Sequence, residues 1–136
     1  MIKIDDWVIE KGEKAQGKIK ISGNGIAMPA TVICGVEDGP TVLITAGIHS
    51  AEYVGIQAAM ELAKEFQPEE LKGNVIIVPL VNVSGFEHRT MSLVYEDGKN
   101  LNRVFPGDPE GTAADRIAHT IVTKLFFHSR LLYRPA

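Results

Sequence analysis

A histidine and a glutamate lie three positions apart in the segment GIHSAE, residues 47–52, directly after an apolar run. Side chains with this spacing share one face in the first turn of a helix. A neutral imidazole and a carboxylate both suit zinc, and two histidines, a glutamate and a water form a catalytic zinc set. His49 and Glu52 are therefore candidate metal ligands. The alternative is a carboxylate that favours a helix N-terminus beside a hydrogen-bonded histidine.

A second polar segment reads Asn100-Leu101-Asn102-Arg103 and lies in a long loop. An arginine can bind a carboxylate through two parallel hydrogen bonds, and a neighbouring amide adds a directional donor. Asn102 and Arg103 are therefore candidates for binding a carboxylate. The alternative is a solvated loop arginine beside a turn-forming asparagine.

The elements around these segments follow an α/β pattern. Residues 18–22 alternate and residues 27–35 are apolar, which predicts two strands that could form a hairpin. The short apolar runs 41–46 and 74–81 are typical of strands buried on both faces. The first fifteen residues are polar, and we expect them to be loosely held.

A helix is predicted between the two buried strands, over residues 51–66, with Ser50 as its N-cap. Its apolar residues at helical spacing include Val54 and Met60. The preceding segment, residues 37–40, reads as a strong turn because it contains Gly and Pro. A strand–helix–strand order implies a right-handed crossover and a parallel pair of strands.

The long segment 82–111 is rich in Gly, Pro, Asp and Asn and has no clear periodicity. Long loops of this kind are often functional. Residues 112–127 predict the last helix, and Thr112 with Asp115 has the spacing of a capping box. The chain should then supply another central strand.

The composition is that of one globular domain or a part of one: 136 residues, 45% hydrophobic, with a formal net charge of −3. The absence of a long basic run argues against nucleic acid and anionic membranes as partners. No apolar run approaches the roughly 18 residues of a membrane span. The start lacks the apolar core of a signal peptide, so we expect a cytoplasmic protein. Cys34 lies in an apolar run and is predicted to be buried rather than reactive.

GIHSAE combined with the later NLNRVFPG resembles the succinylglutamate desuccinylase and aspartoacylase family, which is related to the zinc carboxypeptidases. The resemblance runs from about residue 17 to residue 128 and includes NVSGFE at residues 82–87. Many members have Gly-Asp where this chain has Ser50 and Ala51. Those positions do not ligate the metal in the family.

The resemblance implies a role for each candidate. His49 and Glu52 would be two of three zinc ligands, and Asn102 and Arg103 would hold a carboxylate of the substrate. The implied fold has three layers, αβα, around a mixed and partly parallel sheet, as in the zinc carboxypeptidases.

The resemblance also implies an arginine, in the loop before Asn102, that polarises the scissile carbonyl and stabilises its oxyanion. Arg89 is the candidate, and Met91 lies near the same aligned position. The implied reaction is hydrolysis of the amide bond of an N-acyl amino acid, in which zinc activates a water. The general-base glutamate of the family lies beyond the end of this chain.

The family's third zinc ligand is a histidine at the end of the strand after the last helix. This chain reads SRLLYRPA there, residues 129–136. Codons can be chosen for this segment such that removing a single base changes the reading frame. The shifted frame then encodes a sequence like the strand of relatives, ending in histidine or glutamine. We therefore hypothesise that residues 1–128 are the N-terminal part of a zinc hydrolase catalytic domain, incomplete at the C-terminus. Residues 129–136 would be an aberrant, frameshifted tail.

The tail could still fill the strand position, since Leu131, Leu132 and Tyr133 are apolar. Arg130 and Arg134 would then have to reach water, because an unpaired buried charge is costly. Missing strands would leave an exposed sheet edge, and a homodimer through that edge is one expectation.

Three other histidines could in principle replace the lost ligand, but none has a spacing that demands a metal. His88 lies in the long loop, His119 is expected to be exposed on the last helix, and His128 is expected at its C-terminal end, where the dipole favours a cation.

The sequence thus predicts a zinc-dependent hydrolase of N-acyl amino acids, here in a truncated form with impaired or no activity. The expected partner is a small-molecule N-acyl amino acid. One alternative is a zinc carboxypeptidase, which would share His49, Glu52 and Arg103 but cut a peptide C-terminus. The other is a non-catalytic α/β remnant.

Overall fold

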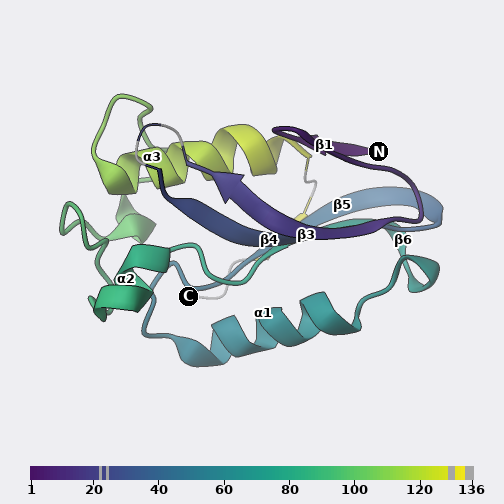
Figure 1. Cartoon of the computed structure of the whole chain (residues 1–136), viewed down its shortest axis with the longest axis horizontal. Coiled ribbons are helices and arrows are strands. Elements are labelled where there is room, and N and C mark those ends of the chain that lie inside the picture. The colour runs from purple at the N-terminus through teal and green to yellow at the C-terminus, as the bar shows by residue number, and fades with distance from the viewer. Residues whose placement is uncertain (22, 24, 129–130, 134–136) are drawn as a thin grey trace.

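A computed structural model describes residues 1–21, 23, 25–128 and 131–133 of the chain. A five-stranded mixed sheet lies between helix α1 on one face and helix α3 with a small hairpin, β1–β2, on the other (Figure 1). This arrangement confirms the predicted three-layer α/β fold. The sheet strands, in spatial order, are β3 (Lys14–Lys20), β4 (Ala27–Cys34), β6 (Lys72–Val78), β5 (Glu37–Thr45) and β7 (Leu131–Tyr133).

The strand pairing is partly parallel, as predicted. β3 and β4 form an antiparallel hairpin, and β4 pairs antiparallel with β6. β5 and β6 are parallel because α1 (Tyr53–Glu65) connects them across one face. The predicted turn at residues 37–40 is wrong: these residues belong to β5, whose register with β6 is irregular between Glu37 and Thr41.

The apolar runs in β5 and β6 are buried on both faces of the sheet. Leu43 and Ile76 join the core on the α3 side, whereas Ile44 and Ile77 join the core against α1. A strand that is covered on both faces has no wet side, which is why these two runs do not alternate.

Helix α1 packs on the sheet through Ile56, Ala59 and Ala63. The predicted stripe is wrong in part, because Val54 is 86% exposed and Met60 is 52% exposed. The buried face of α1 carries two alanines, and such small residues let the helix approach the sheet closely. The prediction relied on larger apolar residues, which lie on a neighbouring face of the helix.

The N-terminal residues are well packed, contrary to the prediction. β1 (Ile2–Ile4) and β2 (Trp7–Ile9) form an antiparallel hairpin, and three of its isoleucines, at positions 2, 4 and 9, are buried. Trp7 lies directly over Gly17 of β3, where any Cβ would overlap its indole ring. Cys34 is buried beneath this hairpin, as predicted, and burial raises the pKa of its thiol.

The last helix begins with the predicted capping box of Thr112 and Asp115. Regular helix α3 (Ala113–Thr120) continues into a π-helical turn, Ile121–Leu125, and a 3₁₀ turn, Phe126–His128. Ile117, Ile121 and Leu125 bury its apolar side.

The tail fills a strand position, as predicted, because β7 pairs with β5 in parallel. Arg130 and Arg134 lie outside the described residues, and a dimer through the sheet edge stays a prediction. Every helix in the described part of the chain is too short or too polar to cross a bilayer.

Candidate functional site

The candidate metal ligands lie just beyond the carboxyl end of β5. The chain leaves the strand at Ala46, whose N–H donates to the carbonyl of Val78 on β6 (2.9 Å). It turns at Gly47, where φ is +70° and an added Cβ would lie 2.7 Å from the Leu80 side chain. Glycine is therefore required at this exit. Open α/β sheets place their sites at this end of the strands, and His49 follows directly.

His49 and Glu52 face each other just before α1. Nδ1 of His49 lies 3.6 Å from Oε2 of Glu52. That oxygen is buried and has no hydrogen-bond partner among the described residues, although 40% of the Glu52 side chain is exposed. A buried carboxylate oxygen without a partner is unfavourable unless a cation or donor satisfies it.

The pair fits a zinc ion. Two donor atoms bound tetrahedrally, each about 2.1 Å from one ion, lie roughly 3.4 Å apart. The separation of 3.6 Å between His49 Nδ1 and Glu52 Oε2 is close to this value. It is also longer than a good hydrogen bond, so the two groups do not satisfy each other.

The segment 100–103 lies beside His49, as a shared site requires. Nε2 of His49 is 3.0 Å from Oδ1 of Asn100. The same oxygen accepts the N–H of Asn102 (3.1 Å) and begins a 3₁₀ turn, Leu101–Arg103. Leu101 is buried, while the side chains of Asn102 and Arg103 are exposed toward solvent. The contact of Asn100 with His49 was not expected, although the residue opens the NLNR motif.

Arg89 lies close to the histidine loop but outside these contacts. It caps the short helix α2 (Val83–His88) in a left-handed conformation, with φ of 57°. Arg89 and Ser50 line the same small cavity of about 30 Å³. The predicted N-cap role of Ser50 is wrong, because its hydroxyl donates to the carbonyl of Met91 (2.9 Å) and Glu52 occupies the cap position of α1.

Asn82 is a fully buried residue that ties the site together, and its role was missed. Its Oδ1 accepts the N–H of Gly85 and so caps α2 (3.1 Å). Its Nδ2 donates to the carbonyls of Leu93 (3.0 Å) and Ile48 (3.5 Å). One side chain therefore joins the start of α2, the long loop and the residue before His49.

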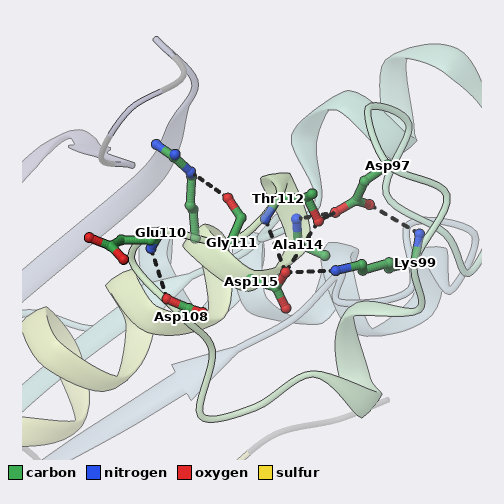
Figure 2. A network of polar contacts seen from close by, with 9 residues as sticks. Asp97, Lys99, Asp108, Glu110, Gly111, Thr112, Ala114 and Asp115 are labelled. Atoms are coloured by element: carbon green, nitrogen blue, oxygen red, sulfur yellow. Dashed lines mark hydrogen bonds and ion pairs between the residues drawn. The ribbon is translucent and has the colours of Figure 1, made fainter.

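The loop that carries Asn100 is anchored to the N-terminus of α3 by a network of polar contacts (Figure 2). Asp97 accepts from the N–H of Ala114 and the hydroxyl of Thr112, both at 2.7 Å, and from the N–H of Lys99. Lys99 Nζ is 2.7 Å from Asp115 Oδ2. Two carboxylates thus lie at a helix N-terminus, where the dipole favours negative charge.

The anchor should make stability depend on pH. The hydrogen bond from Lys99, and then that from the Thr112 backbone, lowers the pKa of Asp115. A carboxyl with a lowered folded-state pKa contributes stability above the unfolded pKa, and this contribution is lost as pH falls through the folded pKa. Asp115→Asn should therefore lower the melting temperature at pH 7, and the difference from wild type should narrow as pH falls below 4.

Thermal unfolding at a series of pH values measures this difference. Asp6→Asn, in the exposed turn between β1 and β2, is the matched control. Its melting temperature should differ little from that of the wild type at every pH. If the difference in melting temperature between Asp115→Asn and wild type stayed constant down to pH 2, the proposed role of the Asp115 charge would be contradicted.

The remaining histidines do not complete a metal site. Among the described residues, no group of three or more His, Cys, Asp or Glu side chains could hold an ion. His88 stacks on Tyr95, with ring centroids 3.6 Å apart, and His128 Nε2 lies 3.1 Å from the carbonyl of Lys3. His119 is partly buried rather than exposed.

Residues 38–133 match the family described as the succinylglutamate desuccinylase/aspartoacylase catalytic domain. The chain belongs to this family. It is 41% identical over 112 residues to the N-alpha-acetyl-L-2,4-diaminobutyric acid deacetylase of Halomonas elongata, a match that covers 81% of this chain and 30% of the relative. The resemblance predicted from the two motifs is thereby confirmed.

Solved structures of similar proteins have the same architecture. A succinylglutamate desuccinylase/aspartoacylase from Rhodobacter sphaeroides aligns with a TM-score of 0.85 and 32% identity, over 96% of this chain and 42% of that one. The product-bound ectoine utilization protein EutE from Ruegeria pomeroyi aligns with a TM-score of 0.81 and 31% identity, over 95% and 41%. The chain thus spans less than half the length of these two proteins.

A likeness of fold alone extends to thrombin activatable fibrinolysis inhibitor, with a TM-score of 0.62 and 15% identity, over 88% of this chain and 41% of that one. The predicted carboxypeptidase-like architecture is in agreement with this likeness.

Proposed function

We propose that this chain forms part of the active site of a zinc-dependent hydrolase that cleaves the amide bond of N-acyl amino acids. One observation carries the proposal: in a member of a deacylase family, the buried Oε2 of Glu52 faces Nδ1 of His49 at the carboxyl end of β5 and has no hydrogen-bond partner among the described residues. Residues 1–128 then correspond to the N-terminal part of the catalytic domain.

His49 Nδ1 and Glu52 Oε2 would hold the zinc ion. When bound, zinc supplies a Lewis acid for the scissile carbonyl and a water with a lowered pKa. These two residues would supply only part of the zinc coordination sphere, and other groups would have to complete it. We therefore expect the 136-residue chain alone to have impaired activity.

Asn102 and Arg103 would bind the carboxylate of the amino acid. Their side chains are exposed beside the residue that contacts His49, so a bound carboxylate would place its amide near the metal ligands. Arg89, which lines the same small cavity as Ser50, would donate to the carbonyl oxygen as negative charge develops on it.

The relatives' names suggest the substrates to test. The Halomonas relative is a deacetylase of N-alpha-acetyl-L-2,4-diaminobutyric acid, and the family description includes succinylglutamate desuccinylase. We propose the same class for this site: a small N-acyl amino acid whose free carboxylate reaches Arg103.

Release of free amine measures the proposed reaction. The purified chain with zinc would be incubated with N-acetyl-2,4-diaminobutyrate, N-succinylglutamate and a dipeptide, and compared with Glu52→Gln and Arg103→Leu. We expect slow hydrolysis of the N-acyl amino acids, lost in Glu52→Gln and reduced at least tenfold in kcat/KM in Arg103→Leu. Cleavage of the dipeptide alone would favour the carboxypeptidase alternative. No hydrolysis, or equal hydrolysis by Glu52→Gln, would favour the non-catalytic remnant.

A further inference from the structure

The carboxamide oxygen of Asn100 has two nitrogen neighbours. The backbone nitrogen of Asn102 lies 3.1 Å from Oδ1, and Nε2 of His49 lies 3.0 Å from the same atom. One oxygen has two lone pairs and can accept both hydrogen bonds.

The backbone contact identifies that atom as the oxygen. Asparagine oxygen and nitrogen are normally distinguished only through their partners, because the two ends of the carboxamide have the same shape. A backbone N–H can only donate, so the atom that faces Asn102 must be an acceptor. A flipped carboxamide would place an NH₂ group against this N–H and is excluded.

The identity of the oxygen determines the protonation of the histidine. In a neutral imidazole one ring nitrogen carries a proton and the other a lone pair. Because Asn100 Oδ1 is an acceptor, Nε2 of His49 must carry the proton. We propose that Asn100 is a positioning residue that holds His49 in the Nε2-protonated tautomer, with the lone pair of Nδ1 facing Glu52.

The surrounding loop keeps Asn100 in place. Leu101 is fully buried, and Asn100 forms an isolated antiparallel bridge with Leu93. On the other side, Lys99 is joined to Asp115 on α3. The carboxamide therefore extends from a backbone that is fixed at both ends.

The tautomer of His49 would determine how it binds a metal. This part of the inference, unlike the rest, depends on the proposed function. A metal binds the ring nitrogen that has the lone pair, and the partner of the other nitrogen determines which one that is. With Nε2 protonated, Nδ1 is available 3.6 Å from Glu52 Oε2. The opposite tautomer would turn an N–H toward the carboxylate and block a shared ion.

Nitrogen NMR of the metal-free, ¹⁵N-labelled chain tests the inference without any catalysis. At alkaline pH, where imidazole is neutral, long-range ¹H–¹⁵N spectra distinguish protonated from unprotonated ring nitrogens. His49→Gln identifies the signals of His49. We expect the wild type to show a protonated Nε2 and an unprotonated Nδ1, and Asn100→Ala to show a mixture of tautomers.

Two further variants separate positioning from a general structural effect. Asn100→Asp retains the acceptor oxygen and should restore the Nε2-protonated form. Asn74→Ala removes a side-chain hydrogen bond to Thr41 at the other end of the sheet and should leave the His49 signals unchanged. In zinc titrations, Asn100→Ala should bind about 10- to 100-fold more weakly than wild type, as is typical of lost partners of metal-binding histidines.

The wild-type spectrum alone can overturn the inference, whatever the variants do. An Nδ1-protonated His49, or equal populations of both tautomers, would contradict it. An Asn100→Ala chain that folds and keeps the wild-type tautomer would also contradict it. A confirmed tautomer in a chain that binds no zinc would support the positioning role and count against the proposed function.

Discussion

Replacing Glu52 with glutamine should weaken zinc binding by more than about 100-fold, while the metal-free chain should lose no stability. Zinc affinity falls while stability does not, because the carboxylate is poorly satisfied without a cation. Its Oε2 atom is buried and has no hydrogen-bond partner in the described part of the chain. Glutamine keeps the shape of the side chain but removes the charge that zinc requires.

Competition with a chromophoric chelator measures the zinc affinity, and thermal unfolding in EDTA measures the stability of the metal-free chain. Glu61→Gln is a matched control, since Glu61 is an exposed glutamate on α1 that pairs with Gln57 (3.2 Å). It should leave zinc affinity unchanged, whereas His49→Gln should lower it as much as Glu52→Gln does. Equal affinities in wild type and Glu52→Gln would rule out this pair as the metal site.

Replacing Asn82 with alanine should lower the free energy of unfolding by about 2–4 kcal/mol. The substitution leaves the buried N–H of Gly85 without its acceptor in the native structure. It also removes one of two hydrogen bonds to the carbonyl of Leu93, which the Thr90 hydroxyl keeps as its other donor. Buried polar groups without a partner cost far more than an average hydrogen bond contributes. The variant should also release the loop that carries Asn100.

Urea unfolding gives the change in free energy, and hydrogen exchange shows where protection is lost. We expect faster exchange in residues 83–103 and unchanged exchange in β4 and β6. Asn74→Ala removes a single, partly buried side-chain hydrogen bond and should cost only about 1 kcal/mol. If the two variants were equally stable, Asn82 would not have the central role that its contacts indicate.

Most of the sheet could be predicted from the sequence, because its strands are encoded by patterns of residues that are close together in the chain. The buried runs in β5 and β6, the β3–β4 hairpin and the Thr112–Asp115 capping box all depend on neighbouring residues. The N-terminal hairpin was missed because its three isoleucines are scattered among charged residues. They are buried because the hairpin packs on the core of the sheet, where Trp7 lies over Gly17 of β3, and such contacts between distant strands are absent from any local pattern.

The candidate site likewise has residues that the sequence could suggest and residues that it could not. His49 and Glu52 are three positions apart, so spacing alone could suggest them. Asn100 contacts His49 across 51 positions, and Asn82 reaches Ile48 across 34. Such contacts are created by the fold, and a single sequence contains no signal of them apart from the polar residues themselves.

The attachment of the Asn100 loop to α3 through Asp97 has a consequence for the thermodynamics of recognition. The conformational entropy of this loop is lost when the protein folds, so little of it remains to be lost when a ligand binds. Ligand affinity and the local stability of the loop should therefore rise and fall together. Substitutions at the α3 end of the loop can then change affinity without any contact with the ligand.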